Sequence, residues 1–191
     1  MTKQDLRKRA RQLRKDFVAR RGSPLFPVAA PSMAAFDALL TSARCLAGYV
    51  AMHSEADPSA LLMHAATRNV ALALPWIGDA GNEMLFRAWR PADPLHLCTA
   101  GFEQPLPHAP VVTPDIILLP LLGFDRAGNR LGQGAGHYDR ALAKQDHALR
   151  IGLAWSVQAF DTLPADPWDM PLDAILTEAE WILPPLSRIG H

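Results

Sequence analysis

The chain has 191 residues, of which 49% are hydrophobic, so it is long enough to form one domain with a sizeable core. Lysine plus arginine and aspartate plus glutamate each total 19, and this balance lacks the overall positive charge typical of a general nucleic-acid or membrane binder. Since no apolar run approaches the roughly 20 residues that span a bilayer, we expect one monomeric, cytoplasmic domain over residues 1–191 with neither a membrane nor nucleic acid as partner.

The first segment, residues 3–20, has the pattern of an amphipathic helix that docks on the body of the protein. Its apolar residues recur at three- and four-residue steps: Leu6, Ala10, Leu13 and Phe17. Many basic residues share the segment, and a solvated helix face is the ordinary explanation of such a run. Lys3 and Arg7, however, stand four residues apart on one face and could clamp a polyphosphate.

The remaining chain alternates apolar runs with amphipathic segments. Strands are predicted at 45–52, 70–74, 84–89, 116–119, 150–154 and 174–177, and helices at 32–40, 58–67 and 138–144. We expect Pro75 to end the second strand and residues 90–114 to form a long surface excursion without regular structure. The alternation predicts an α/β domain with an open, mostly parallel sheet flanked by helices, a Rossmann-like three-layer sandwich.

A glycine-rich loop follows the strand at 116–119. Its glycines are Gly123, Gly128, Gly132, Gly134 and Gly136. Glycines let the backbone approach an anion, and the N–H groups at the start of the next helix point toward it. The loop has neither the GxGxxG nor the Walker A pattern, but Arg130 adds a fixed cation and Asp139 a hard oxygen ligand suited to magnesium. His137 could move a proton or stack on a ligand ring.

Two other loops carry acidic residues at strand ends. Glu55 and Asp57 could accept hydrogen bonds from an amino-substituted heterocycle, and Asp57 could equally cap the helix that begins near Pro58. Asp169, in a late loop with other acids, could join Asp139 on one magnesium ion, although acidic surface loops are common. Ligands of open α/β sheets bind at the carboxyl ends of the strands, where such loops meet.

The run LLGFDRAGNRLGQGAGHYDRAL, residues 121–142, resembles the signature of the 5-formyltetrahydrofolate cyclo-ligase family. The resemblance extends to Lys3 and Arg7, to the segment 55–58 and to Asp169. It implies an enzyme that uses ATP and Mg²⁺ to convert 5-formyltetrahydrofolate to 5,10-methenyltetrahydrofolate, with ADP and phosphate as the other products. ATP would phosphorylate the formyl oxygen, and N10 of the folate would then attack the activated carbon.

The resemblance also implies residue roles. The residues implied to contact ATP are Lys3, Arg7, Arg130, Leu131, Gly132, Gln133, Gly134, Ala135, Gly136, His137 and Tyr138. The residues implied to contact the reduced folate are Met52, Glu55, Asp57, Gln133, Gly134, Ala135, Gly136 and His137. Catalytic roles fall on Arg130, His137 and Tyr138, and magnesium would be held by Asp139 and Asp169. The chain departs from the family pattern at His137, where a tyrosine is common, and at Pro58, where a threonine is usual.

Two other classes of function remain open at this point. A sugar-phosphate isomerase or CoA-transferase-like enzyme would use a similar α/β layout without hydrolysing ATP. A nucleic-acid-binding module would use the basic first helix, but the balanced charge and the lack of an aromatic stacking platform argue against it.

Overall fold

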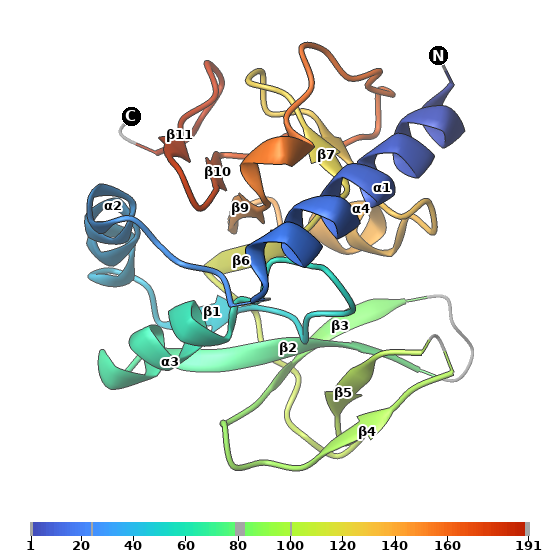
Figure 1. The fold of residues 1–191 in the computed structure, drawn as a ribbon. Coiled ribbons are helices and arrows are strands. Elements are labelled where there is room, and N and C mark those ends of the chain that lie inside the picture. Colours follow the sequence, from blue (N-terminus) through green and yellow to red (C-terminus); the bar gives the residue numbers. More distant parts are fainter. Residues whose placement is uncertain (1, 24, 79–82, 100, 190–191) are drawn as a thin grey trace.

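The computed structural model describes residues 2–23, 25–78, 83–99 and 101–189. Within these residues, seven strands form the main sheet in the order β11-β10-β9-β6-β1-β2-β3 (Figure 1). Its strands are β1 (Cys45–Ala47), β2 (Ala71–Ile77), β3 (Met84–Ala88), β6 (Ile116–Pro120), β9 (Leu149–Leu153), β10 (Ala174–Leu176) and β11 (Trp181–Ile182). The strands from β10 to β2 pair in parallel, and the two edge strands pair antiparallel to their neighbours. The predicted α/β class with a mostly parallel sheet is confirmed.

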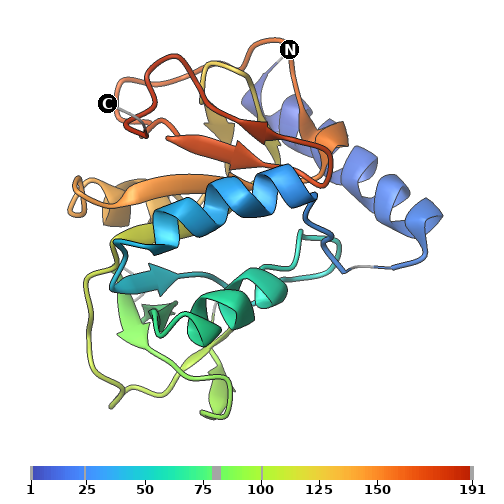
Figure 2. The ribbon, with the colours of Figure 1, turned by 90° about the vertical axis from the view of Figure 1, so that its left-hand side faces the viewer.

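Helices cover both faces of this sheet. They are α1 (Lys3–Arg21), α2 (Ala30–Leu40), α3 (Ser59–Thr67), α4 (His137–Leu142) and the short 3-10 helix η1 (Ser156–Gln158). Figure 2 shows α2 and α3 in front of the sheet. Because side chains alternate along a strand, Leu46 joins the core beneath α2 and α3, and Ala47 joins the opposite cluster with Leu142 of α4. In the part of the chain that the structure describes, no helix is long and apolar enough to cross a membrane.

The first helix lies across the loops at the carboxyl ends of the strands. Its start is fixed by a capping box between Thr2 and Asp5, in which the Asp5 N–H donates to the Thr2 hydroxyl at 3.1 Å. Leu6 and Ala10 are buried against the loops after β6, as predicted. Phe17 is half-buried, and its ring packs 5.5 Å from that of Trp155. Leu13 is only partly buried. The next buried residue on this face of α1 is Arg14.

Three predictions about the strands were wrong. Pro75 does not end β2, which continues to Ile77 while pairing with β3. This is possible because β1 pairs with β2 only as far as Ala73, so the side of Pro75 that lacks an N–H faces no strand. The predicted strand 45–52 is also shorter than expected, because β1 ends at Ala47.

The third correction concerns the expected excursion 90–114. It contains an antiparallel hairpin of β4 (Leu95–Leu97) and β5 (Glu103–Pro105), with Ala100 outside the described residues. A second hairpin, β7 (Gly123–Phe124) with β8 (Arg130–Leu131), lies at the start of the glycine-rich loop. The hairpins place residues of both segments beside the main sheet.

Candidate active site

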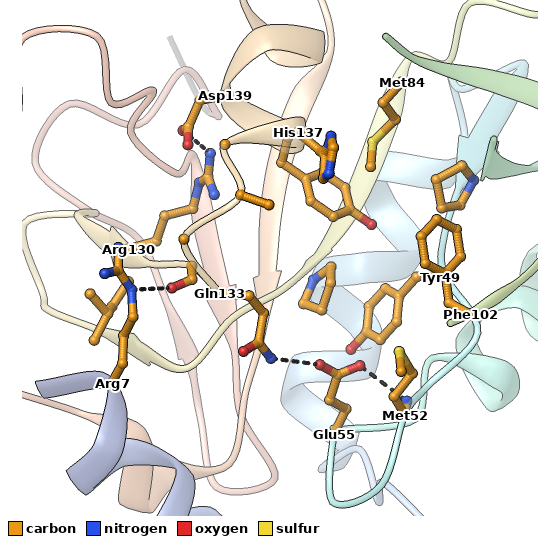
Figure 3. Close-up of a pocket in the computed structure, with 18 of the residues that line it drawn as sticks. Arg7, Tyr49, Met52, Glu55, Met84, Phe102, Arg130, Gln133, His137 and Asp139 are labelled. Atoms are coloured by element: carbon orange, nitrogen blue, oxygen red, sulfur yellow. Dashed lines mark hydrogen bonds and ion pairs between the residues drawn. The ribbon is translucent and has the colours of Figure 1, made fainter. Parts of the chain in front are cut away.

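A cavity of about 660 Å³ opens at the carboxyl ends of the strands. The predicted site residues that line it are Lys3, Arg7, Met52, Glu55, Asp169 and every residue of 130–139. Figure 3 shows charged side chains at one end of the cavity and aromatic and methionine side chains at the other. We name these ends the cationic wall, formed by Lys3, Arg7 and Arg130, and the apolar wall, formed by Tyr49, Met52, Ile77, Met84 and Phe102.

The cationic wall joins α1 to the glycine-rich loop. The Arg7 Nε donates to the Gly132 carbonyl oxygen at 3.0 Å. Gly134 has φ +108°, and a Cβ at that position would lie 3.4 Å from the Arg7 Cζ. A glycine is favoured there because the backbone is in the left-handed region, and the Arg7 guanidinium packs beside it.

Arg130 is the most deeply placed cation of this wall. Its side chain is 5% exposed and forms an ion pair with Asp139. Its Nε is buried and has no hydrogen-bond partner among the residues that the structure describes. Since buried donors in folded proteins are nearly always paired, this donor points to a ligand acceptor. The helix α4, at six residues, is too short to add much dipole, so the anion-binding character rests on the loop and the cations.

Carboxylates surround the cationic wall. Lys3 Nζ lies 2.6 Å from Asp166 Oδ2 and 3.0 Å from Asp169 Oδ2. Burial would lower the pKa of Lys3, but the hydrogen bonds to both carboxylates outweigh it and raise the pKa. Burial likewise opposes ionisation of Asp169, yet the Asp166 N–H, Lys3 and Arg130 together lower its pKa. Asp169 is therefore ionised near neutral pH.

The acids also suit a magnesium ion. No cluster of three or more His, Cys, Asp or Glu side chains able to hold a metal occurs in the described residues. Magnesium, however, is commonly held by one or two carboxylates with phosphate oxygens and water. Asp139 pairs with Arg130, and the charge of Arg130 also acts on Asp169, so these two acids fit such a site once a phosphate engages the cation.

The apolar wall comes from segments far apart in the sequence. Tyr49 follows β1, Ile77 and Met84 lie on the β2–β3 pair, and Phe102 precedes β5. Burial, reinforced by the charge of Glu55, raises the pKa of Tyr49 well above its usual value. The pKa of Tyr138 is raised by the same two causes, although Arg130 opposes them. Both phenols are therefore neutral, and the Tyr49 hydroxyl donates to the Ala56 carbonyl oxygen.

Glu55 supplies the carboxylate beside this wall, whereas Asp57 does not. Glu55 is 8% exposed, and its Oε2 accepts a hydrogen bond from the Met52 N–H at 3.1 Å. Asp57 is not among the residues lining the cavity. Its Oδ1 accepts a hydrogen bond from the Ser59 N–H at 2.9 Å beside the start of α3, whose N-cap position is Pro58. The contact of Asp57 with the ligand stays a prediction.

His137 and Tyr138 begin α4 and line the cavity. The His137 Nδ1 lies 3.1 Å from Arg140 Nη2. Burial and the charge of Arg140 lower the pKa of His137, so the imidazole is neutral at pH 7. A neutral ring at this position suits stacking or hydrogen bonding better than charge stabilisation.

Several lining residues were missed by the sequence interpretation. Arg11 and Arg14 line the cavity with Lys3 and Arg7. The spacing of these four residues, at steps of four, four and three, places them on one helix face, so the signal was present in the sequence. Tyr49, Ile77, Met84 and Phe102 had no comparable local signal, because long-range strand pairing brings them together.

Comparison with known proteins gives concordant matches. The model of the 5-formyltetrahydrofolate cyclo-ligase family matches residues 1–178. A 5-formyltetrahydrofolate cyclo-ligase of Mycolicibacterium smegmatis is 35% identical over 156 residues, or 76% of this chain and 79% of the relative, and one of Haemophilus influenzae is 33% identical over 141 residues, or 70% and 75%. The solved structure of Aquifex aeolicus 5,10-methenyltetrahydrofolate synthetase aligns with a TM-score of 0.71 at 27% identity, covering 100% of this chain and 97% of that one.

Proposed function

The chain belongs to the 5-formyltetrahydrofolate cyclo-ligase family, and we propose that it uses magnesium and ATP to convert 5-formyltetrahydrofolate to 5,10-methenyltetrahydrofolate. The observation that carries this proposal is one cavity with a cationic wall at one end and an apolar wall beside a carboxylate at the other. The first suits a polyphosphate, and the second suits a flat, amino-substituted ring. The isomerase and transferase alternatives rest on the α/β layout alone, and the family match over residues 1–178 sets them aside.

The proposed reaction overcomes the poor reactivity of a formamide. The oxygen of the N5-formyl group attacks the γ-phosphorus of ATP. The bond between that phosphorus and the oxygen bridging to the β-phosphate breaks, and ADP leaves. N10 then attacks the activated carbon and loses its proton, the carbon–oxygen bond breaks, and phosphate departs with the formyl oxygen. The ring is closed by a new carbon–nitrogen bond, and no protein nucleophile is required.

Phosphoryl transfer of this kind depends on positioning and charge stabilisation more than on covalent help. Lys3, Arg7 and Arg130 would hold the phosphates, with Arg130 offering the buried Nε that has no partner among the described residues. The glycine-rich loop would bring its backbone N–H groups to the same anion. Neutral Tyr138 and His137 lie at the junction of the two ends and would contact the reacting groups as uncharged partners.

Asp139 and Asp169 would hold magnesium. When bound, the ion would neutralise charge on the phosphate oxygens. Arg130 and Lys3 now pair with these acids, and phosphate oxygens are alternative partners for both cations. Nucleotide binding would therefore release the carboxylates toward the metal.

The test is a turnover assay on the purified protein. With saturating MgATP and 5-formyltetrahydrofolate, we expect the methenyl product to accumulate, followed by its near-ultraviolet absorbance, together with one ADP per product. Omission of either ATP or magnesium should abolish the signal. Absence of product with both substrates saturating would reject the proposed function.

A further inference from the structure

Arg14 is an arginine on the buried face of α1, where an apolar residue would be expected. It follows Leu6 and Ala10 along that face and is 5% exposed, as deeply buried as they are at 5% and 0%. Burial lowers the pKa of its guanidinium, and the charge of Glu55 opposes that effect. A buried charge is costly unless it is paired, so the position of Arg14 needs a functional or structural reason.

The partner of Arg14 is Glu55. The Arg14 Nη1 lies 3.6 Å from Glu55 Oε1, and the two side chains are 6% and 9% exposed. The Arg14 Nε donates to the Ser54 hydroxyl at 3.1 Å, which fixes the guanidinium beside the loop that carries Glu55. Buried ion pairs seldom add net stability over apolar packing, so stability alone does not account for the pair.

The orientation of the Glu55 carboxylate is fixed at both oxygens. Oε2 accepts from the Met52 N–H, and Oε1 accepts from the Gln133 Nε2 at 3.4 Å (Figure 3). The Gln133 Oε1 in turn accepts from Arg11 Nη2 at 2.9 Å. The carboxylate lines the cavity, so lone pairs not used by these donors are available to a ligand that offers N–H groups.

The other groups near Glu55 do not balance its charge. Tyr49 and Tyr138 both sense the Glu55 charge, and both have raised pKa values, so they are neutral near pH 7. Arg11 lies about one turn before Arg14 in α1 and is bonded to Gln133 rather than to Glu55. Among the described residues, Arg14 is the only cation within ion-pair distance of Glu55.

We propose that Arg14 is a positioning residue for folate binding, which holds Glu55 as an oriented acceptor for the N–H groups of the amino-substituted ring. This inference rests on the proposed function and deepens it. It separates α1 into two roles: Lys3 and Arg7 serve the nucleotide, and Arg14 serves the folate through Glu55.

The direct experiment measures binding of 5-formyltetrahydrofolate by calorimetry, without nucleotide, for the wild-type protein and for Arg14→Met. We expect the variant to bind about 10- to 100-fold more weakly, within the range of coupling energies between contacting residues. Its KM for ATP should stay close to the wild-type value. Arg20→Met is the matched control, because Arg20 is exposed in the last turn of the same helix, and it should bind the folate like the wild type.

A double-mutant cycle tests whether Arg14 acts through Glu55. Arg14→Met combined with Glu55→Gln should bind the folate no more weakly than Glu55→Gln alone. If the two losses multiply, Arg14 acts independently and the proposal is wrong. Arg14→Lys, which keeps the charge, guards against a variant that fails to fold; it should recover most of the affinity, and an affinity as weak as that of Arg14→Met would overturn the charge argument.

The split between the two ligands gives a readout that a purely structural role would not change. A general loss of folding in Arg14→Met would weaken both folate and nucleotide binding, whereas loss of the orientation of Glu55 should weaken folate binding alone. Equal losses of affinity for the two ligands would contradict the proposal. Wild-type turnover with unchanged folate affinity in Arg14→Met would defeat this inference alone, whereas absence of wild-type turnover would defeat the proposed function.

Discussion

The two ends of the cavity are built in different ways. The cationic wall consists of one helix face and one continuous loop. Lys3 and Arg7 meet Arg130 where α1 contacts the glycine-rich loop. The apolar wall is assembled from Tyr49, the β2–β3 pair and the segment before β5, which are joined by strand pairing.

The two walls therefore differ in how many segments of the chain supply their side chains. Under the proposed function, the charged residues would act on one small phosphate group, so each of them has few substitutes. The apolar residues would enclose a ring and spread its contacts over a larger area, since burial energy scales with area. Substitution of one residue in the cationic wall should therefore reduce activity more than substitution of one residue in the apolar wall.

The largest expected effect is that of Arg130→Met. Removing a preorganised cation from a buried phosphoryl-transfer site should lower kcat about 100- to 1,000-fold, as for loss of one transition-state donor. Folate binding without nucleotide should change little. Steady-state kinetics and calorimetry measure both, and Arg126→Met, with a side chain 69% exposed in the same loop, is the control. A loss of folate affinity equal to the loss in rate would break the division into two walls.

Asp139→Asn should have the next largest effect. It removes one predicted magnesium ligand, and we expect the magnesium concentration needed for half-maximal nucleotide binding to rise by at least about tenfold, since loss of even a supporting residue costs about 10- to 100-fold in metal affinity. Calorimetric titration of ATP at several magnesium concentrations measures this without relying on turnover. Asp146→Asn, at a side chain 91% exposed, is the matched control. Full rate of Asp139→Asn at limiting magnesium would show that the assignment is wrong.

Phe102→Ala probes the apolar wall. Loss of one aromatic contact should weaken binding of 5-formyltetrahydrofolate by about 2- to 12-fold, corresponding to about 0.5–1.5 kcal/mol, and leave the KM for ATP unchanged. Leu97→Ala, in the same hairpin but 70% exposed, should behave like the wild type. A larger effect on ATP than on the folate would mean that Phe102 belongs to the nucleotide end.

His137→Tyr should have the smallest effect on rate. The imidazole is already neutral at pH 7, so exchanging it for a phenol should alter kcat/KM by less than about fivefold, or 1 kcal/mol. His137 should also make the stability of the fold depend on pH in a defined direction. Because folding lowers the His137 pKa, its neutral form stabilises the fold above about pH 6.5, and this contribution is lost as the pH falls through that value.

Melting temperatures at about pH 7.5 and pH 5.5 measure this contribution, and the decrease between the two should be smaller in His137→Tyr than in the wild type. An equal decrease in both proteins would show that His137 does not titrate as its burial indicates.

Sequence reasoning recovered the fold and one wall for physical reasons. Buried parallel strands are short, continuous apolar runs, and the glycine-rich loop is one stretch of glycines with a cation, so both are visible in a local window. The continuation of β2 past Pro75 depended on where β1 ends, which no local pattern records. Asp57 was ambiguous because the same spacing serves a ligand and a helix cap, and in the structure its carboxylate accepts from the Ser59 N–H beside the start of α3.

Arg14 was missed for a different reason. Its helical spacing with Lys3, Arg7 and Arg11 was visible in the sequence. The apolar periodicity of α1, however, predicted that Leu13 lies on the buried face, and Leu13 is only partly buried. A charged residue on a buried face is identified by its partner, and Glu55 lies 41 residues later in the chain.

The central claim is that ATP and the folate meet in this cavity so that the formyl oxygen is phosphorylated. The most direct test uses 5-formyltetrahydrofolate carrying a heavy-oxygen label in its formyl group, with mass spectrometry of the released phosphate. The account predicts that each methenyl product formed is accompanied by one phosphate that contains the labelled oxygen. Unlabelled phosphate alongside the methenyl product would contradict it.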